Sequence, residues 1–222
     1  MKESRYFFVI AIIIIILIAS GCKDDGGIAA NQQIDASKLP TMVSRNVQTL
    51  LSDSGQTKYR ITTKTWLAYE EQEHPHWVFP DGLIAEELDK QTFNVNMSMK
   101  CDSAHYDRNT RMLNLTGNIT IHDKNGSEIT CDSAYYDEAK ALWSLNSMVT
   151  ITSKDGSKIE TNQMFWDRKA SKYYSDSFIR MQAQDKILEG YGYVSNEKIT
   201  TYKVNRVQAI VPVNDTRFPT FN

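Results

Sequence analysis

Three aspartates recur at thirty-residue intervals and could supply the carboxylates of a hydrolytic site. They are Asp107, Asp137 and Asp167. Paired carboxylates perform general acid–base catalysis when a fold holds them close together. Each of these aspartates, however, opens a short polar segment typical of a turn, where the side chain accepts hydrogen bonds from nearby backbone N–H groups. The sequence contains no nucleophile elbow, phosphate-binding loop or metal-ligand cluster, so we predict a protein that is not an enzyme and uses no cofactor.

Histidine and cysteine could in principle bind a metal or form a covalent link. His74 and His76 would share a face of an extended segment, but Pro75 separates them and no third ligand follows at a metal-site spacing. We therefore expect no metal. Cys101 and Cys131 could pair in an oxidising compartment. Their recurrence at one position of a repeat favours two small buried residues over a disulfide.

The overall composition argues against nucleic-acid binding. The chain has 222 residues, with 25 basic and 27 acidic side chains, a net charge of −2 and a mean hydropathy of −0.45. Proteins that bind DNA or RNA carry a basic patch that neutralises phosphates, and this balance provides none. A length near 200 residues fits one all-β domain or two small ones.

The amino terminus has the features of an export signal. A short positively charged segment precedes thirteen apolar residues, Phe7 to Ala19, fewer than the ~20 of a transmembrane helix. Small residues precede Cys22, as in the lipobox of bacterial lipoproteins. We expect a lipidated Cys22, with an uncleaved signal anchor as the alternative. Either would tether the chain to a membrane with the remainder facing the periplasm.

From about residue 93 the sequence repeats with a period of 30 residues. Cys101-Asp-Ser-Ala-His-Tyr-Asp107 returns as Cys131-Asp-Ser-Ala-Tyr-Tyr-Asp137 and, more divergently, as Thr161-Asn-Gln-Met-Phe-Trp-Asp167. Within each unit apolar residues alternate with polar ones, and turn signals separate the runs. This pattern predicts an all-β body with two antiparallel strands per unit.

The expected organisation follows from these segments. We predict a signal or signal-anchor segment over residues 1–22, a flexible linker over 23–41, a β-domain over 42–213 and a tail over 214–222.

The alternating apolar residues define an inner face with two interpretations. The simpler one is an ordinary core. The other is a slot between two sheets that shelters lipid tails, since a ten-residue strand spans ~33 Å. The candidate lining residues are Val95, Met97, Leu115, Ile119, Ile121, Leu145, Val149, Ile151, Ile179 and Met181.

Several motifs, taken in order, resemble the LptC family in the form typical of Bacteroidota. LptC proteins are the membrane-tethered periplasmic component of the lipopolysaccharide export ABC transporter. The resemblance extends from about Leu39 to Val213. It rests on Val47-Gln-Thr-Leu-Leu-Ser-Asp-Ser-Gly55, Tyr59-Arg-Ile-Thr-Thr-Lys-Thr-Trp66, His74-Pro-His-Trp-Val-Phe-Pro-Asp-Gly82, the repeated Asp-Ser-Ala at 102 and 132, Phe165-Trp-Asp167, Tyr174-Ser-Asp176 and Glu189-Gly-Tyr-Gly-Tyr193.

The resemblance implies an open antiparallel β-jellyroll, or β-taco, anchored to the inner membrane. Such a domain would receive lipopolysaccharide acyl chains from the permease subunits LptF and LptG, which work with the ATPase LptB, and pass them to the periplasmic jellyroll LptA. Partner jellyrolls would add to its edge strands. The implied edge residues are Val43, Val47 and Leu51 towards the permease, and Gly190, Gly192, Val207 and Val211 towards LptA.

A surface lipoprotein that binds glycans is the alternative function. Cys22-Lys-Asp-Asp25 looks like the acidic export tag of surface lipoproteins. Sugar binding would need an outward-facing strip of aromatic rings. The candidates are Trp66, Trp77, Trp143 and Trp166.

Overall fold

The structure is a computed structural model that describes residues 38–53, 55–183 and 186–212. The predicted lipidation site Cys22, the segment 1–22, most of the linker and the tail 214–222 lie outside these residues. The chain divides into two compact units, Met1–Lys38 and Leu39–Asn222. Within the described ranges we find no helix with the length and apolar character needed to cross a bilayer.

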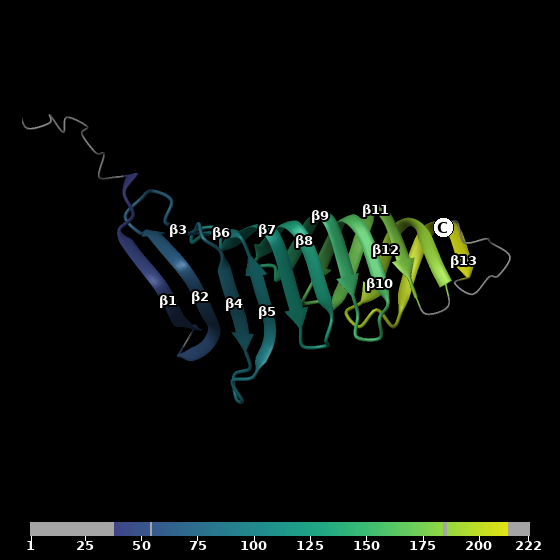
Figure 1. Ribbon diagram of the computed structural model, residues 1–222, viewed down its shortest axis with the longest axis horizontal. Helices are drawn as coiled ribbons and strands as arrows, with labels where there is room; N and C mark the ends of the chain where they lie inside the picture. The colour runs from purple at the N-terminus through teal and green to yellow at the C-terminus, as the bar shows by residue number, and fades with distance from the viewer. Residues whose placement is uncertain (1–37, 54, 184–185, 213–222) are drawn as a thin grey trace, which may run out of the picture. The chain divides into compact units, whose positions relative to one another are not determined.

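The described part of the second unit contains thirteen strands (Figure 1). They are β1 (Met42–Asp53), β2 (Gln56–Tyr69), β3 (His76–Phe79), β4 (Leu83–Leu88), β5 (Val95–Cys101), β6 (Ser103–Asp107), β7 (Met112–Asp123), β8 (Glu128–Asp137), β9 (Leu142–Thr152), β10 (Lys158–Asp167), β11 (Lys172–Gln182), β12 (Lys186–Asn196) and β13 (Tyr202–Pro212).

All of these strands join one antiparallel sheet that follows the order of the chain. β3 and β4 are the two halves of a bent strand, since both pair with β2. β5 and β6 form the next bent strand, since both pair with β7. From β7 to β13 each strand pairs with its sequence neighbours, and Figure 1 shows them following one another along the unit. The predicted all-β open antiparallel jellyroll is confirmed.

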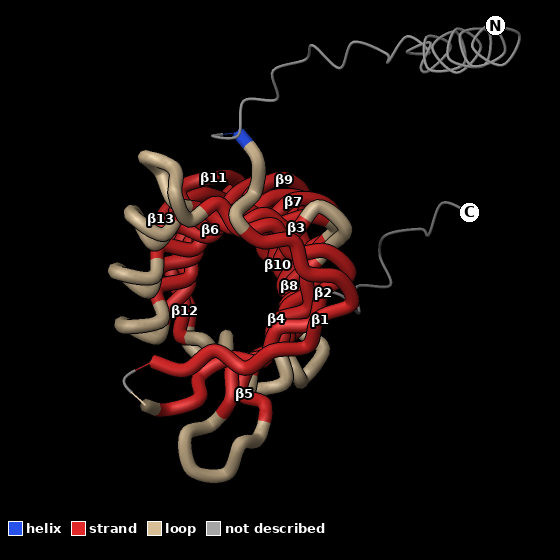
Figure 2. The backbone as a smooth tube through the Cα atoms, turned by 90° about the vertical axis from the view of Figure 1, so that its left-hand side faces the viewer, coloured by secondary structure: helices blue, strands red, loops and turns tan. Residues whose placement is uncertain are grey.

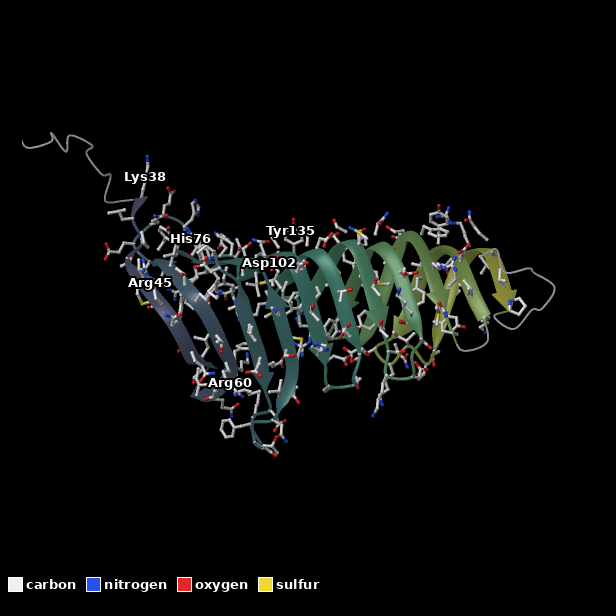
Figure 3. The ribbon with its side chains drawn as sticks, in the orientation of Figure 1. Lys38, Arg45, Arg60, His76, Asp102 and Tyr135 are labelled. Atoms are coloured by element: carbon white, nitrogen blue, oxygen red, sulfur yellow. The ribbon has the colours of Figure 1, made fainter. Side chains whose placement is uncertain are left out.

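A bend near the middle of the long strands folds the sheet on itself. At Gly117 in β7, the backbone has a φ of +77°, and a Cβ there would lie 2.6 Å from the Asp102 carboxylate. Asn118 donates a hydrogen bond of 2.6 Å to that carboxylate, and Asp102 lies between β5 and β6 (Figure 3). Glycine therefore permits both the left-handed backbone and the close approach of the neighbouring strand. Seen along the unit, the strands wind around a common interior (Figure 2).

Equivalent turns stack along one rim of the folded sheet. The Oδ1 atoms of Asp107, Asp137 and Asp167 each accept a hydrogen bond from a backbone N–H three residues later, at 2.8 Å from Thr110, 3.0 Å from Lys140 and 2.9 Å from Ala170. Neighbouring turns are also joined by backbone hydrogen bonds from one turn to the next. The prediction that these aspartates close turns is confirmed.

One inner row of the sheet, which we call the aliphatic row, runs from β2 to β12. Its side chains lie directly opposite one another on successive strands, and each is at most 8% exposed. The members are Ile61, Ala85, Met99, Ile121, Ile129, Ile151, Ile159, Met181 and Leu188.

On the other half-sheet a second inner row is mainly aromatic. This aromatic row contains Trp77, Tyr106, Leu113, Tyr136, Trp143, Trp166 and Tyr173, again paired strand to strand from β3 to β11. Its rings pack with centroid distances of 5.4 Å for Trp77–Tyr106, 4.6 Å for Tyr136–Trp143 and 5.6 Å for Trp166–Tyr173. Such contacts add to the free energy gained by burial. The two half-sheets therefore carry chemically different inner walls.

Cys101 and Cys131 are free thiols buried in the core. Their recurrence as small buried residues, rather than as a disulfide, is thereby confirmed. Burial disfavours the thiolate and raises the pKa of each to about 11.

We expect neither cysteine to react with iodoacetamide in the native protein at pH 8. Only the thiolate reacts, and a pKa of about 11 leaves roughly one thiol in a thousand ionised at that pH. Unfolding in urea should expose both and restore the ordinary pKa, so that both become alkylated. Peptide mapping by mass spectrometry separates them from Cys22. A pair that stays unlabelled after unfolding without reductant would reveal a disulfide and contradict the structure.

Candidate functional site

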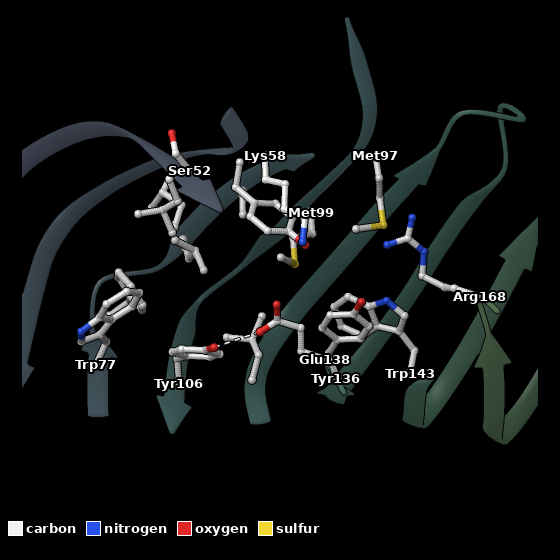
Figure 4. Close-up of a pocket in the computed structure, with 17 residues that line it drawn as sticks. Ser52, Lys58, Trp77, Met97, Met99, Tyr106, Tyr136, Glu138, Trp143 and Arg168 are labelled. Carbon is white, nitrogen blue, oxygen red and sulfur yellow. Dashed lines mark hydrogen bonds between the residues drawn. The ribbon is translucent and has the colours of Figure 1, made fainter. Parts of the chain in front are cut away.

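A cavity of about 270 Å³ lies between the two half-sheets near the amino-terminal end of the unit (Figure 4). The aliphatic row supplies one wall with Ile61, Ala85 and Met99. The aromatic row supplies the other with Trp77, Tyr106, Leu113, Tyr136 and Trp143. Leu51, Ser52, Lys58, Tyr59, Phe79, Leu83, Met97, Glu138 and Arg168 complete the lining.

The aliphatic row has a small side chain at this end, where the cavity forms. Ala85 occupies the position that isoleucine takes in β7, β8, β9 and β10 of the same row. Further along, Ile151 and Ile159 on the aliphatic row and Tyr173 on the aromatic row have no exposed surface. One end of the interior is thus a packed core, and the other leaves room for an apolar guest.

Glu138 gives the aromatic side of the cavity a polar rim. It accepts a hydrogen bond of 3.0 Å from the Tyr106 hydroxyl, drawn in Figure 4, and bonds of 2.7 and 3.2 Å from the Arg111 guanidinium. The hydrogen bonds from Arg111 are the main reason that the pKa of Glu138 lies below its usual value. The carboxylate therefore stays ionised at the edge of an otherwise apolar space.

An ion pair bridges the two rims at the inner end of the cavity. Arg168 lies in the turn between β10 and β11, and its guanidinium is 2.8 Å from a carboxylate oxygen of Glu87 near the end of β4. Burial acts to lower the pKa of Arg168, but the neighbouring Glu87 carboxylate outweighs it and holds that pKa above its ordinary value. The guanidinium also lies over the Trp166 ring, 5.6 Å from its centroid. The pair joins the half-sheets where the cavity ends.

Comparison with models of protein families matches residues 8–207 to the family described as lipopolysaccharide-assembly, LptC-related. The chain belongs to this family. The match covers nearly all of the 222 residues and confirms the family indicated by the sequence motifs. No curated protein matches the sequence. LptC-related proteins act in lipopolysaccharide transport, and this chain is therefore a component of that process.

Within this LptC-family fold, the ten predicted lining residues occupy different environments. Met97 lines the cavity. Val95, at the start of β5, is 45% exposed. Leu115, Ile119, Ile121, Leu145, Val149, Ile151, Ile179 and Met181 belong to the packed core, with exposures of 0–2%. Contact between any of the ten and an acyl chain stays a prediction.

The sequence interpretation missed the aromatic wall of the cavity. Tyr106, Tyr136 and Trp166 directly precede the three turn aspartates, so the thirty-residue repeat already contained the signal. An aromatic residue repeated at one register position predicts a row of rings across neighbouring strands.

The predicted edge residues fall on three strands. Val43, Val47 and Leu51 lie on β1, which within the described residues pairs only with β2. Val207 and Val211 lie on β13, which among those residues pairs only with β12.

Gly190 and Gly192 were expected at this edge, but they lie on β12, one strand further in. At Gly190 a Cβ would lie 2.4 Å from the carbonyl oxygen of Arg206. The absence of a side chain thus lets β13 approach, and this corrects the edge placement of the two glycines.

A glycan-binding surface lipoprotein was expected to carry an outward-facing strip of tryptophans, and this expectation is wrong for all four. Trp66, Trp143 and Trp166 are 8%, 0% and 3% exposed, and Trp77 lines the cavity.

The histidine considered as a metal ligand packs against other rings. His76 stacks between Tyr69 and His105, with ring centroids 4.5 and 5.0 Å away. A search of the described residues finds no metal-binding group of His, Cys, Asp and Glu.

A double-mutant cycle tests the ion pair that joins the rims. We expect Glu87→Gln and Arg168→Gln each to lower the free energy of unfolding, and the double variant to lose less than their sum. The coupling should be about 1 kcal/mol, because both side chains are only about a quarter exposed. Urea denaturation of the four proteins gives the value.

Arg180 and Glu189 provide the matched control, since they form a more exposed ion pair between the adjacent strands β11 and β12. Their coupling should be smaller. Equal coupling in the two cycles would show that the rim pair adds nothing beyond an ordinary surface pair.

Proposed function

We propose that this LptC-family domain is a passive periplasmic carrier of lipopolysaccharide acyl chains. It receives them from the permease subunits LptF and LptG, which are driven by LptB, and passes them to the LptA jellyroll. The observation that carries the proposal is the open apolar cavity between an aliphatic and an aromatic wall. Such a space has the chemistry of a lipid-tail site rather than of a catalytic one.

The energetics suit a carrier that must also release its cargo. Burial contributes ~0.8 kcal/mol per methylene group, so ten methylenes in the cavity would gain on the order of 8 kcal/mol. This corresponds to micromolar rather than picomolar binding. Because the cavity is open to one side, a chain can leave without unfolding of the domain.

One buried donor in the wall has no partner of its own. The indole Nε1 of Trp143 makes no hydrogen bond within the described structure, although the side chain has no exposed surface. A buried donor without an acceptor costs free energy. Because this atom has no accessible surface, neighbouring side chains would have to move before an oxygen of a bound acyl chain could accept its hydrogen bond.

The carboxyl-terminal edge supports transfer to a further jellyroll. Ile210 on β13 lies opposite Leu188 and continues the aliphatic row, but its side chain is 60% exposed. A strand added to β13 would cover Ile210 and extend the apolar wall into the next domain. The edge at β1 would receive the permease jellyroll in the same way.

The amino-terminal segment would hold this domain at the inner membrane. A lipidated Cys22, or an uncleaved anchor over residues 7–21, supplies the tether in this proposal. The export-signal pattern and the family both support a periplasm-facing, inner-membrane location.

A photo-crosslinking amino acid tests the carrier function in cells. We expect an adduct with lipopolysaccharide when it replaces Met99, which lines the cavity, and adduct formation should depend on ATP supply. The photo-crosslinking amino acid in place of Ile119 or Val149 tests the predicted lining residues that lie beyond the cavity. Immunoblots of the purified chain with an antibody against lipopolysaccharide report the adduct.

Lys100 is the matched control, because it neighbours Met99 on β5 and its side chain is exposed. We expect no adduct there. Adducts at Lys100 but never at the inward positions would contradict the carrier function.

Crosslinking at the two edges tests the order of partners. We expect the photo-crosslinking residue to capture the permease jellyroll at Val43 and LptA at Val207, since each lies on a strand with one free side within the described sheet. Tyr135 on β8 is a control of similar exposure, 44% against 50% and 48%, in the middle of the sheet. Capture of either partner at Tyr135, or the reverse assignment at the edges, would contradict the proposed direction of transfer.

A further inference from the structure

A second cavity lies beyond the Arg168–Glu87 ion pair and is polar where the first is apolar. Its volume is about 190 Å³. One rim supplies Asn96, Lys124 and Asn125 to its lining, and the other supplies Lys169 and Ser171. Met97 and Arg168 line both cavities, so the two spaces share a wall. An apolar cavity beside a polar one matches the acyl chains and the polar head of an amphiphile.

The carboxylates around the polar cavity are already engaged. Glu87 pairs with Arg168. Asp123 accepts hydrogen bonds from the backbone N–H groups of Asn125 and Ser127, both at 2.8 Å. A third carboxylate, that of Glu197, accepts a 2.8 Å bond from the Trp166 indole. These contacts orient the carboxylate oxygens towards groups of the protein, while the lining as a whole balances three acidic against three basic side chains.

The cationic groups, by contrast, keep free bonding capacity. Lys124 is exposed and makes no hydrogen bond or ion pair within the described part of the chain. The Lys169 ammonium donates one bond of 2.8 Å, to the carbonyl oxygen of Ala139, which leaves two donors. The Arg168 guanidinium has five N–H donors, more than its contacts with Glu87 and Tyr136 use. Two of these cations reach the cavity from one rim and the third from the other.

We infer that the polar cavity binds the phosphate-bearing head of the lipid whose acyl chains occupy the apolar cavity. This inference rests on the proposed carrier function and adds a second point of contact. A phosphate group presents several acceptor oxygens to donors on both rims, and charge-assisted hydrogen bonds of this kind are stronger than neutral ones. Asn96 and Ser171 add uncharged groups able to bind the attached sugar.

The two binding contributions can be separated with one pair of ligands and two pairs of substitutions. The ligands are lipopolysaccharide and the same material after enzymatic removal of its phosphates. The test variant is K124Q/K169Q, and neither lysine lines the apolar cavity. The control is K154Q/K198Q, which removes two exposed turn lysines that line neither cavity. Lys154 is the equivalent of Lys124 thirty residues later.

Each full-length protein is measured in detergent with the photo-crosslinking residue at position 99. The affinity for a lipid is the concentration at which that lipid suppresses formation of the crosslink to labelled lipopolysaccharide. We expect K124Q/K169Q to bind intact lipopolysaccharide about three- to tenfold more weakly, as for the loss of two charge-assisted contacts. Its affinity for the dephosphorylated lipid should equal that of the parent protein. The K154Q/K198Q control should bind both lipids as the parent does.

Equal affinity of the parent protein for the two lipids would overturn the inference while leaving the carrier function intact. An equal loss in K124Q/K169Q and K154Q/K198Q would overturn it too, because a general charge effect would then explain the result. Failure of the parent to bind either lipid would instead refute the carrier function.

Competition with inorganic phosphate distinguishes a lipid head from a free anion. If phosphate displaced the lipid at micromolar concentration, the cavity would be a site for the free anion and not for a lipid head.

Discussion

The interior of this domain depends on the register between neighbouring strands, since a shift of one residue would turn the apolar side chains of a strand to water. In the aliphatic row the register brings Ile121, Ile129, Ile151 and Ile159 into line across four successive strands. Irregularities at the bends, such as that between Thr116 and Ile119, let each half-sheet keep its own alignment. The stacked aspartate turns hold the same alignment along one rim. Two continuous and chemically distinct walls are the consequence.

The side chains along the two walls divide the interior into a packed end and an open end. A cavity lowers stability, because the atoms that line it lose dispersion contacts and the transfer free energy of the missing groups. Here the fully buried Trp143, Tyr173 and Tyr193 lie beyond or beside the cavity and supply large buried surfaces. The packed end thus stabilises the strands that continue into the open end. A binding space can persist at Ala85 and Met99 without a ligand to fill it.

Much of this fold could be predicted from the sequence, because alternation and turn signals are local properties. Period-2 alternation identified the inward residues except Val95, which is exposed, and the repeat identified the turns around Asp107, Asp137 and Asp167. Alternation does not distinguish an inward residue that packs from one that faces a cavity. That distinction depends on contacts between half-sheets, such as Arg168 with Glu87, whose partners are distant in the sequence. The aromatic wall was overlooked because its residues adjoin the turn motifs.

Net charge, which is −2 for the whole chain, hides a local arrangement that matters for an amphiphilic cargo. Carboxylates around the polar cavity bind groups of the protein itself, whereas Lys124 and Lys169 line the same cavity with donors to spare. A phosphate held at such a rim keeps part of its hydration, so its desolvation cost is smaller than in a closed site. Burial of the acyl chains would then provide most of the affinity, and the head contacts would fix the orientation. The proposed carrier would need this division, because strong binding at both points would retain a lipid that has to be passed on.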